Sequence, residues 1–221
     1  MASHAHPPSL ALREQFESAE QQREASTLGM WIFLVTEIMF FGGAFLAYTI
    51  YRWKFQDTFA YASSTLNATI GAVNTAVLLC SSFTMVLAVR ASQLGNRKAL
   101  VVFLILTMVL GSAFLGVKAF EWHDKYVEHH VPGPNFHWEG ANPGQASIFF
   151  SLYFSTTGLH ALHMVIGMGM MLILTIQAFR GRYTKEYNTP IEMGGLYWHF
   201  VDIVWIFLFP LLYLIDRHLP K

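Results

Sequence analysis

The chain has 221 residues, of which 54% are hydrophobic and only 13% are charged, about half the charged share of roughly 25% found in soluble domains. This composition excludes an ordinary soluble domain. The formal net charge of zero and the lack of a basic face or a nucleic-acid motif argue against nucleic acid as a partner. The single cysteine, Cys80, can form neither an internal disulfide nor a cysteine-based metal site.

The N-terminal tail, residues 1–27, is polar and carries acidic residues throughout. No apolar stretch precedes Leu28, so we expect no cleavable signal peptide, and the first apolar block acts as the insertion signal. Residues 9–26 mix apolar side chains with Glu, Gln and Arg. We predict a short amphipathic helix there, lying on the cytoplasmic face or against a partner.

Five apolar blocks predict an all-α fold, with a membrane domain over residues 28–216 that is a bundle of five transmembrane helices. The blocks cover about residues 28–50, 66–89, 99–120, 146–178 and 196–215. None shows the polar–apolar alternation of a barrel strand. The fourth block is longer than a vertical crossing needs, so we expect it to tilt or to project from the bilayer. Residues 217–221 form a short C-terminal tail.

The distribution of Lys and Arg predicts the orientation of these helices, because cytoplasmic loops carry more of them. Eight lie in the N-terminal tail and in the loops on the same side: Arg13, Arg23, Arg90, Arg97, Lys98, Arg180, Arg182 and Lys185. Six lie on the other side: Arg52, Lys54, Lys118, Lys125, Arg217 and Lys221. The bias places the N-terminus in the cytoplasm and the C-terminus outside.

Glu37 lies near the middle of the first block, where a charged residue costs roughly 2.5–3.5 kcal/mol on insertion scales. It must therefore face protein or water rather than acyl chains. Two interpretations are open at this point: a group that handles protons, or a structural hydrogen bond that joins two helices.

Four more ionisable side chains lie inside the last two blocks: His160, His163, His199 and Asp202. They form two pairs, and the members of each pair share a helix face because residues three apart are neighbours on a helix. We predict a polar helix-packing seam, in which Asp202 accepts a hydrogen bond from His199 or from a donor on another helix. The alternative is a b-type haem, since haem iron takes axial histidine ligands.

Three residues at block ends are predicted to anchor the bundle at the membrane interface or at lipid headgroups: Glu121, Trp122 and Trp198. Tryptophan suits this position because its ring is apolar and its N–H is polar. The longest loop holds three histidines, His129, His130 and His137, for which we predict a solvated loop or a partner contact. No zinc signature or nucleophile motif is present, so we predict no catalytic and no metal-ligating residue.

Three motifs together resemble subunit III of the haem-copper respiratory oxidases, the cytochrome c oxidase subunit 3 family. They are GMWIFLVTEIMFFGGAF in the first block, TTGLHALHMVIG in the fourth and LYWHFVDIVWIFLFPLLYLI in the fifth. The resemblance covers Leu28 to Asp216 and implies the five-span bacterial form, which lacks the first two helices of the seven-span mitochondrial subunit. It matches Glu37 to the family's buried mid-span glutamate and Glu121 to the acid that closes the third-from-last helix. It also matches the polar seam, residue by residue: His160, His163, His199 and Asp202.

This resemblance implies a non-catalytic subunit of a bacterial inner-membrane oxidase that reduces oxygen to water and pumps protons. Haem and copper are then expected in partner subunits and none in this chain, while bound phospholipid is expected here. Subunit I is the principal expected partner, with subunit II, a small subunit IV and a respiratory supercomplex beyond it. The chain would pack against subunit I and support proton uptake and turnover, as part of an oxidoreductase and translocase complex without a catalytic centre of its own.

The resemblance favours a cytochrome c oxidase and leaves two relatives of it open, a quinol oxidase and the subunit-III-like companion of a nitric oxide reductase. Outside the family, the histidines keep a b-type haem protein as an alternative. Glu37 keeps an autonomous proton channel as another, although broken helices and inverted repeats, the usual marks of a transporter, are missing from the sequence.

Overall fold

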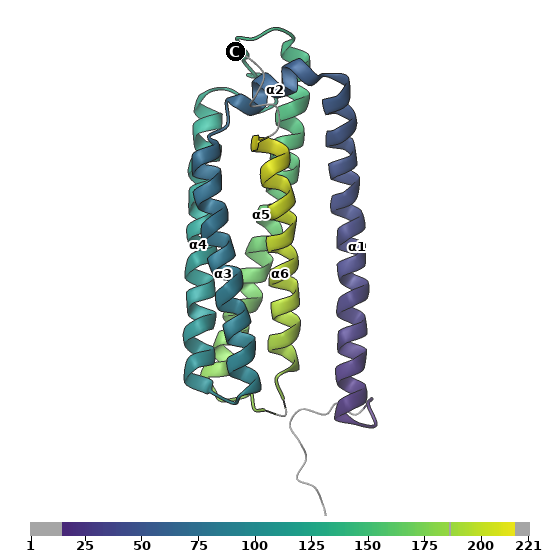
Figure 1. The fold of residues 1–221 in the computed structure, drawn as a ribbon, viewed down its shortest axis with the longest axis vertical. Helices are drawn as coiled ribbons and strands as arrows, with labels where there is room; N and C mark the ends of the chain where they lie inside the picture. The colour runs from purple at the N-terminus through teal and green to yellow at the C-terminus, as the bar shows by residue number, and fades with distance from the viewer. Residues whose placement is uncertain (1–14, 186, 215–221) are drawn as a thin grey trace, which may run out of the picture.

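The computed structural model describes residues 15–185 and 187–214, which form a bundle of long helices (Figure 1). The elements are α1 (Ala19–Lys54), α2 (Gln56–Ser64), α3 (Ala68–Gln93), α4 (Arg97–Val127), α5 (Pro143–Phe179), α6 (Thr189–Phe209) and a π-helical segment, η1 (Pro210–Leu214), that continues α6. This described part contains no strand. One end of the bundle carries α2 and the loop between α4 and α5, and we call it the loop end; the other, where α1 begins, is the N-terminal end.

Five of these helices are long and apolar enough to cross a membrane: α1, α3, α4, α5, and α6 together with η1. The predicted five-helix membrane bundle is therefore confirmed. With 36, 31 and 37 residues, α1, α4 and α5 exceed the roughly 20 residues that cross the hydrocarbon core. Their ends therefore extend beyond the apolar layer.

Helix α1 begins closer to the N-terminus than its apolar block does. Its N-cap is Ser18, whose hydroxyl accepts a hydrogen bond from the Gln21 backbone N–H at 3.1 Å, satisfying a donor at the helix start. Residues 19–26 are therefore the first turns of α1, because their Glu, Gln and Arg side chains favour helix and continue it. The helix predicted over residues 9–26 is therefore present over residues 19–26, although as part of α1 rather than as a short helix of its own; residues 15–18 are not helical, and residues 9–14 lie outside the described residues.

The short helix α2 was not predicted from the apolar blocks. It packs at the loop end with Phe59 and Ala62 buried. Two of its hydroxyls bind other elements: Thr58 to the Gln145 side chain of α5 at 2.8 Å, and Ser63 to the Leu212 carbonyl of η1 at 2.7 Å. Because these bonds leave α2 in different directions, α2 holds the loop ends of α5 and η1 together.

Helix α6 lies at the centre of the bundle, with 61% of its most apolar stretch buried. The indole of Trp198 is fully buried there and lies against two glycines. A Cβ at Gly111 of α4 would come within 2.9 Å of this ring, and one at Gly167 of α5 within 3.0 Å. Both glycines therefore make room for Trp198, which joins α4, α5 and α6.

Helix α1 lies at the edge of the bundle (Figure 1). Only 11% of its most apolar stretch is buried. Large apolar side chains such as Ile32, Met39 and Leu46 are exposed. An exposed apolar surface of this extent marks a membrane or protein contact.

Candidate functional site

Glu37 of α1 and His163 of α5 form a pair that joins these two helices. The Glu37 Oε2 atom lies 3.0 Å from His163 Nε2, and the two side chains are 19% and 11% exposed. His163 Nδ1 lies 2.8 Å from the Leu159 backbone carbonyl, which can only accept, so Nδ1 must carry a hydrogen. The Glu37–His163 contact is then either a protonated carboxyl donating to imidazole or an imidazolium donating to carboxylate. In both forms, one proton lies between the two side chains.

His160 lies one turn away on α5 and forms no such pair. It is 1% exposed, and neither ring nitrogen has a hydrogen-bond partner among the described residues. Its ring packs instead against Phe114, with 5.6 Å between ring centroids, and against Trp205, at 5.1 Å. The structure thus places His160 and His163 on one helix but in different surroundings.

His199 and Asp202 of α6 meet helix α3. The Ser82 hydroxyl lies 2.8 Å from His199 Nδ1, so the partner of His199 comes from another helix. Asp202 is 2% exposed, and neither carboxyl oxygen has a hydrogen bond of ordinary geometry with the described residues. The hydroxyl of Ser82 approaches this carboxyl. The predicted seam is therefore two separate sites, Glu37–His163 and His199–Ser82–Asp202, with His160 apart from both.

These positions bear on the haem alternative. An axial haem ligand needs a ring nitrogen that is free to bind iron. Both nitrogens of His163 are engaged, by Leu159 and by Glu37, and Nδ1 of His199 is engaged by Ser82. The nitrogens of His160 have no partner among the described residues, but its ring packs against Phe114 and Trp205. Within residues 15–185 and 187–214, no three His, Cys, Asp or Glu side chains are placed to hold a metal ion.

A second buried polar group lies near the loop end, and we call it the loop-end cluster: Lys118 and Glu121 of α4, Tyr153 of α5 and Tyr213 of η1. Lys118 Nζ donates to Glu121 Oε2 at 3.2 Å, to the Tyr153 hydroxyl at 3.2 Å and to the Tyr213 hydroxyl at 2.7 Å. Both tyrosine hydroxyls donate to Glu121 Oε1, Tyr153 at 2.7 Å. The ammonium also lies 5.0 Å from the centre of the Trp205 ring, a cation–π contact.

The loop-end cluster corrects the predicted interface anchors. Glu121 is 9% exposed and is held by three donors inside the bundle, because three helical elements converge around it. Trp198 is fully buried in the bundle centre, where its N–H donates to Ser81 Oγ at 3.2 Å. Trp122 is half-buried against Phe154, with 6.0 Å between ring centroids. Neither Glu121 nor Trp198 is free to contact headgroups.

Sequence reasoning missed several residues of these sites: Lys118, Tyr153, Tyr213 and Ser82. A signal for the cluster was present, since Lys118 and Glu121 are three residues apart and a helix places them on one face. Ser82 had no signal, because serine is common inside membrane helices and hydrogen-bonds within its own helix as readily as across to another.

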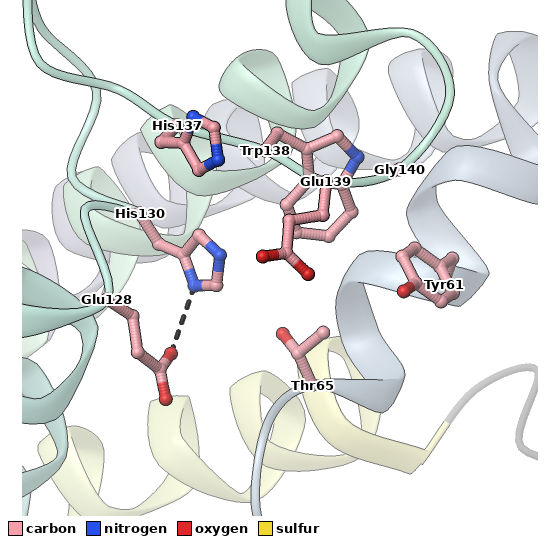
Figure 2. A pocket seen from close by; sticks show the side chains of 8 residues that line it. All are labelled: Tyr61, Thr65, Glu128, His130, His137, Trp138, Glu139 and Gly140. Carbon is pink, nitrogen blue, oxygen red and sulfur yellow. Dashed lines mark hydrogen bonds and ion pairs between the residues drawn. The ribbon is translucent and has the colours of Figure 1, made fainter.

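A pocket of about 350 Å³ lies at the loop end, outside the spans predicted from the apolar blocks, and Figure 2 shows the side chains around it. Its lining residues are Tyr61, Thr65, Glu128, His130, His137, Trp138, Glu139 and Gly140. Glu128 Oε2 lies 3.0 Å from His130 Nδ1 and 2.6 Å from Lys125 Nζ, and Lys125 also donates to the Thr65 carbonyl at 3.0 Å. Lys125 therefore joins the end of α4, the α2–α3 turn and the loop.

Two groups of this pocket have shifted pKa values. Burial, with the repulsion of the Lys125 ammonium, lowers the pKa of His130 below its usual value, although the Glu128 carboxylate opposes this. Burial tends to raise the pKa of Glu128, but the hydrogen bond and the charge of Lys125, together with His130, outweigh it and lower that pKa. The loop therefore favours a neutral His130 and a charged Glu128.

The comparison with known proteins decides the family. The family model described as cytochrome c oxidase subunit III matches residues 17–216 of this chain. The chain belongs to the cytochrome c oxidase subunit III family. The resemblance carried by the three sequence motifs is confirmed, and the chain is a subunit III of the haem-copper oxidase type.

Members of this family from different organisms are similar to the chain over most of its length. The cytochrome c oxidase subunit 3 of Alkalihalophilus pseudofirmus is 32% identical over 198 residues, which are 90% of each chain. The quinol oxidase subunit 3 of Bacillus spizizenii is 33% identical over 187 residues, 85% of each chain. The cytochrome c oxidase subunit 3 of Loxodonta africana is 31% identical over 201 residues, which cover 86% of this chain but only 70% of that longer protein.

Proposed function

We propose that this chain is the non-catalytic subunit III of a bacterial terminal oxidase, a cytochrome c oxidase that reduces oxygen to water and pumps protons. The observation that carries the proposal is the family match over residues 17–216. The polar side chains support it, because Glu37 and His163 bind each other, and the members of the loop-end cluster likewise bind each other. In this proposal haem and copper belong to partner subunits, and this chain supports proton uptake and turnover.

A quinol oxidase is the second candidate, and the quinol oxidase relative favours it as much as the cytochrome c oxidase relative favours the first. Their identities to this chain are 33% and 32%. The subunit-III-like companion of a nitric oxide reductase stays a third candidate.

Helix α1 supports the choice of subunit I as the principal partner. Its exposed face carries Gly42 and Gly43, and a Cβ added at either would meet nothing within 4 Å. Small residues let a neighbouring helix approach closely in a membrane. We place subunit I against this face and phospholipid along the remaining exposed side chains of α1. Subunit II, a small subunit IV and a respiratory supercomplex are contacts of the same assembly.

The proposed location is the bacterial inner membrane, with the N-terminus in the cytoplasm and the C-terminus outside. The count of Lys and Arg supports this orientation. By sequence, eight basic residues lie in the N-terminal tail and in the loops on the same side, against six on the other side.

Purification of the tagged chain from its native membranes tests this function. We expect subunits I and II to co-purify, with haem and copper, and the chain separated from them to be colourless. Solitary purification would contradict the proposal, and a Soret band in the separated chain would favour the b-type haem alternative. Gly43→Ile should reduce the recovery of subunit I, whereas Ala72→Ile, at an exposed small residue of α3, should not.

A further inference from the structure

A groove at the N-terminal end of the bundle separates α1 from α3 and α6. It has a volume of about 440 Å³. Its lining includes Arg23 of α1, Arg90 and Gln93 of α3, and Glu192 and His199 of α6. Charged and amide side chains come from the helix ends, while His199 lies ten residues beyond Thr189, or about 15 Å along the helix axis. The groove therefore leads from a polar mouth to an imidazole at membrane depth.

The mouth of the groove holds a fixed set of charges. Glu192 Oε2 lies 3.4 Å from an Arg23 guanidinium nitrogen, and Gln93 Nε2 donates to Glu192 Oε1 at 2.9 Å. Arg90 adds a second positive charge from α3. Among the described residues, no side chain of α4 or α5 lines the groove, nor does Glu37 of α1, whose carboxyl contacts His163 instead.

His199 connects this groove to a buried carboxyl through one hydroxyl. His199 lines the groove, and its Nδ1 atom contacts Ser82 at 2.8 Å, so Nε2 is the ring nitrogen left to face the groove. A serine hydroxyl accepts and donates at the same time. When His199 Nδ1 carries hydrogen and donates to Ser82, the Ser82 hydroxyl hydrogen is free to point at Asp202.

Asp202 is the acceptor at the end of this chain. It is 2% exposed, and both of its oxygens lack a partner of ordinary hydrogen-bond geometry in the described part of the chain. A buried carboxylate without a cation or a set of donors is costly, whereas the neutral acid is much less so. Binding a proton is therefore the way in which the Asp202 carboxylate loses its charge at this buried position.

We propose that His199, Ser82 and Asp202 form a proton-binding site that is loaded through the groove at the N-terminal end. A proton from solvent in the groove binds His199 Nε2, the Nδ1 proton passes to Ser82 Oγ, and the Ser82 hydroxyl proton passes to the Asp202 carboxylate. One proton moves from the groove to the carboxyl, and no electrons are transferred. The site deepens the proposed support of proton uptake and rests on the proposed function only for its use by the oxidase.

Infrared spectroscopy of the full chain, in the membrane complex in which it is purified, tests this site. A protonated Asp202 gives a carbonyl-stretch band that shifts on transfer to D₂O, and we expect this band to vanish in Asp202→Asn. In Ser82→Ala the carboxyl is kept but the relay is cut, so hydrogen–deuterium exchange of the band should slow by roughly tenfold or more.

Ser92→Ala is the matched control. The Ser92 hydroxyl lies on the same helix and donates to the Val89 backbone carbonyl at 2.7 Å, so its loss should leave the exchange rate unchanged. Three outcomes would overturn the proposal: no exchangeable carboxyl band in the unmodified chain, a band that persists in Asp202→Asn, or equal exchange rates in Ser82→Ala and Ser92→Ala. Failure to recover oxidase subunits would count against the proposed function and leave this result unaffected.

Discussion

The loop-end cluster and the His199–Ser82–Asp202 site each bury a carboxyl group inside the bundle, yet their surroundings are opposite. Glu121 accepts hydrogen bonds from Lys118, Tyr153 and Tyr213, which lie on three elements. Asp202 accepts none of ordinary geometry from the described residues. A saturated cluster fixes the relative positions of helices, because any change of protonation breaks bonds within it. An unsaturated carboxyl next to a reachable imidazole is free to exchange a proton.

Lys118→Met should cause the largest loss of stability, because it disrupts the loop-end cluster, whose carboxylate is saturated with hydrogen bonds. It leaves the Glu121 carboxylate buried without its cation, and breaking one partner out of a buried ion pair costs about 3–5 kcal/mol. Thermal unfolding of the purified complex should show a large loss of stability, or the chain should fail to accumulate in the membrane.

Two further variants make this prediction specific. Lys98→Met, at an exposed position of the same helix, should have little effect. Lys118→Met combined with Glu121→Gln should recover part of the stability, since no unpaired charge remains. If the single and double variants were equally unstable, the packing of Lys118 rather than its charge would hold α4, α5 and η1 together.

Gly111→Ala should have the next largest effect, where α4 packs against Trp198, the residue before His199. Its Cβ would lie 2.9 Å from Trp198, whose indole is fully buried and has no room to shift. Overpacking of this kind costs about 1–3 kcal/mol. Gly116→Ala on the same helix is the control, because its Cβ would meet nothing within 4 Å. Equal melting temperatures for the two variants would show that the core around Trp198 adapts.

The two sites also differ in how far the sequence could predict them. The five spans follow from local hydropathy, so they could be predicted, whereas the start of α1 depends on polar residues that extend the helix beyond its apolar block. The loop-end cluster joins Lys118 to side chains 35 and 95 residues away along the chain, and helix periodicity predicts only its i, i+3 pair. The bond between Glu37 and His163 joins residues 126 positions apart, so helix periodicity could not predict it either.

Asp202 shows a different limit. Its position in an apolar helix predicts that it satisfies a donor, because a buried carboxyl normally does. In the described part of the chain no donor reaches it with ordinary geometry, since the Ser82 hydroxyl that approaches it also serves His199. The sequence could therefore show that Asp202 is unusual, but it could not show whether Asp202 has hydrogen-bond partners.

Glu37→Gln should destabilise the protein less than Gly111→Ala does. It tests the Glu37–His163 pair, which has fewer hydrogen bonds than the loop-end cluster and more than Asp202. The amide can still bond to His163 Nε2 as donor or acceptor, so we expect a loss within about 1 kcal/mol. Glu37→Leu removes the partner altogether and should cost about 1–3 kcal/mol. Thermal unfolding of both variants measures the difference, and a severe loss in Glu37→Gln would show that charge on Glu37 holds the pair.

The smallest predicted effect concerns the loop between α4 and α5, whose stability should depend on pH while that of the loop-end cluster does not. Because the pKa of His130 is lowered in the folded protein, the unfolded loop binds a proton first as the pH falls through about 6.5, the usual histidine value. Its contribution to stability is therefore present above that pH and is lost below it. The lowered pKa of Glu128 acts at lower pH, as the pH falls through the usual carboxyl range of about 4.

Hydrogen–deuterium exchange of residues 128–142, corrected for the intrinsic effect of pH, should therefore rise between about pH 7.5 and about pH 5.5. His130→Gln should remove this rise, since the amide does not titrate, while His137→Gln, at an exposed ring of the same pocket, should keep it. Peptides containing Tyr153 and Lys118 should stay protected at both pH values, because that cluster contains no histidine and is closed to solvent. If the loop and the cluster loosened together, Lys125 would couple them, and the loop end would respond to acid as one unit.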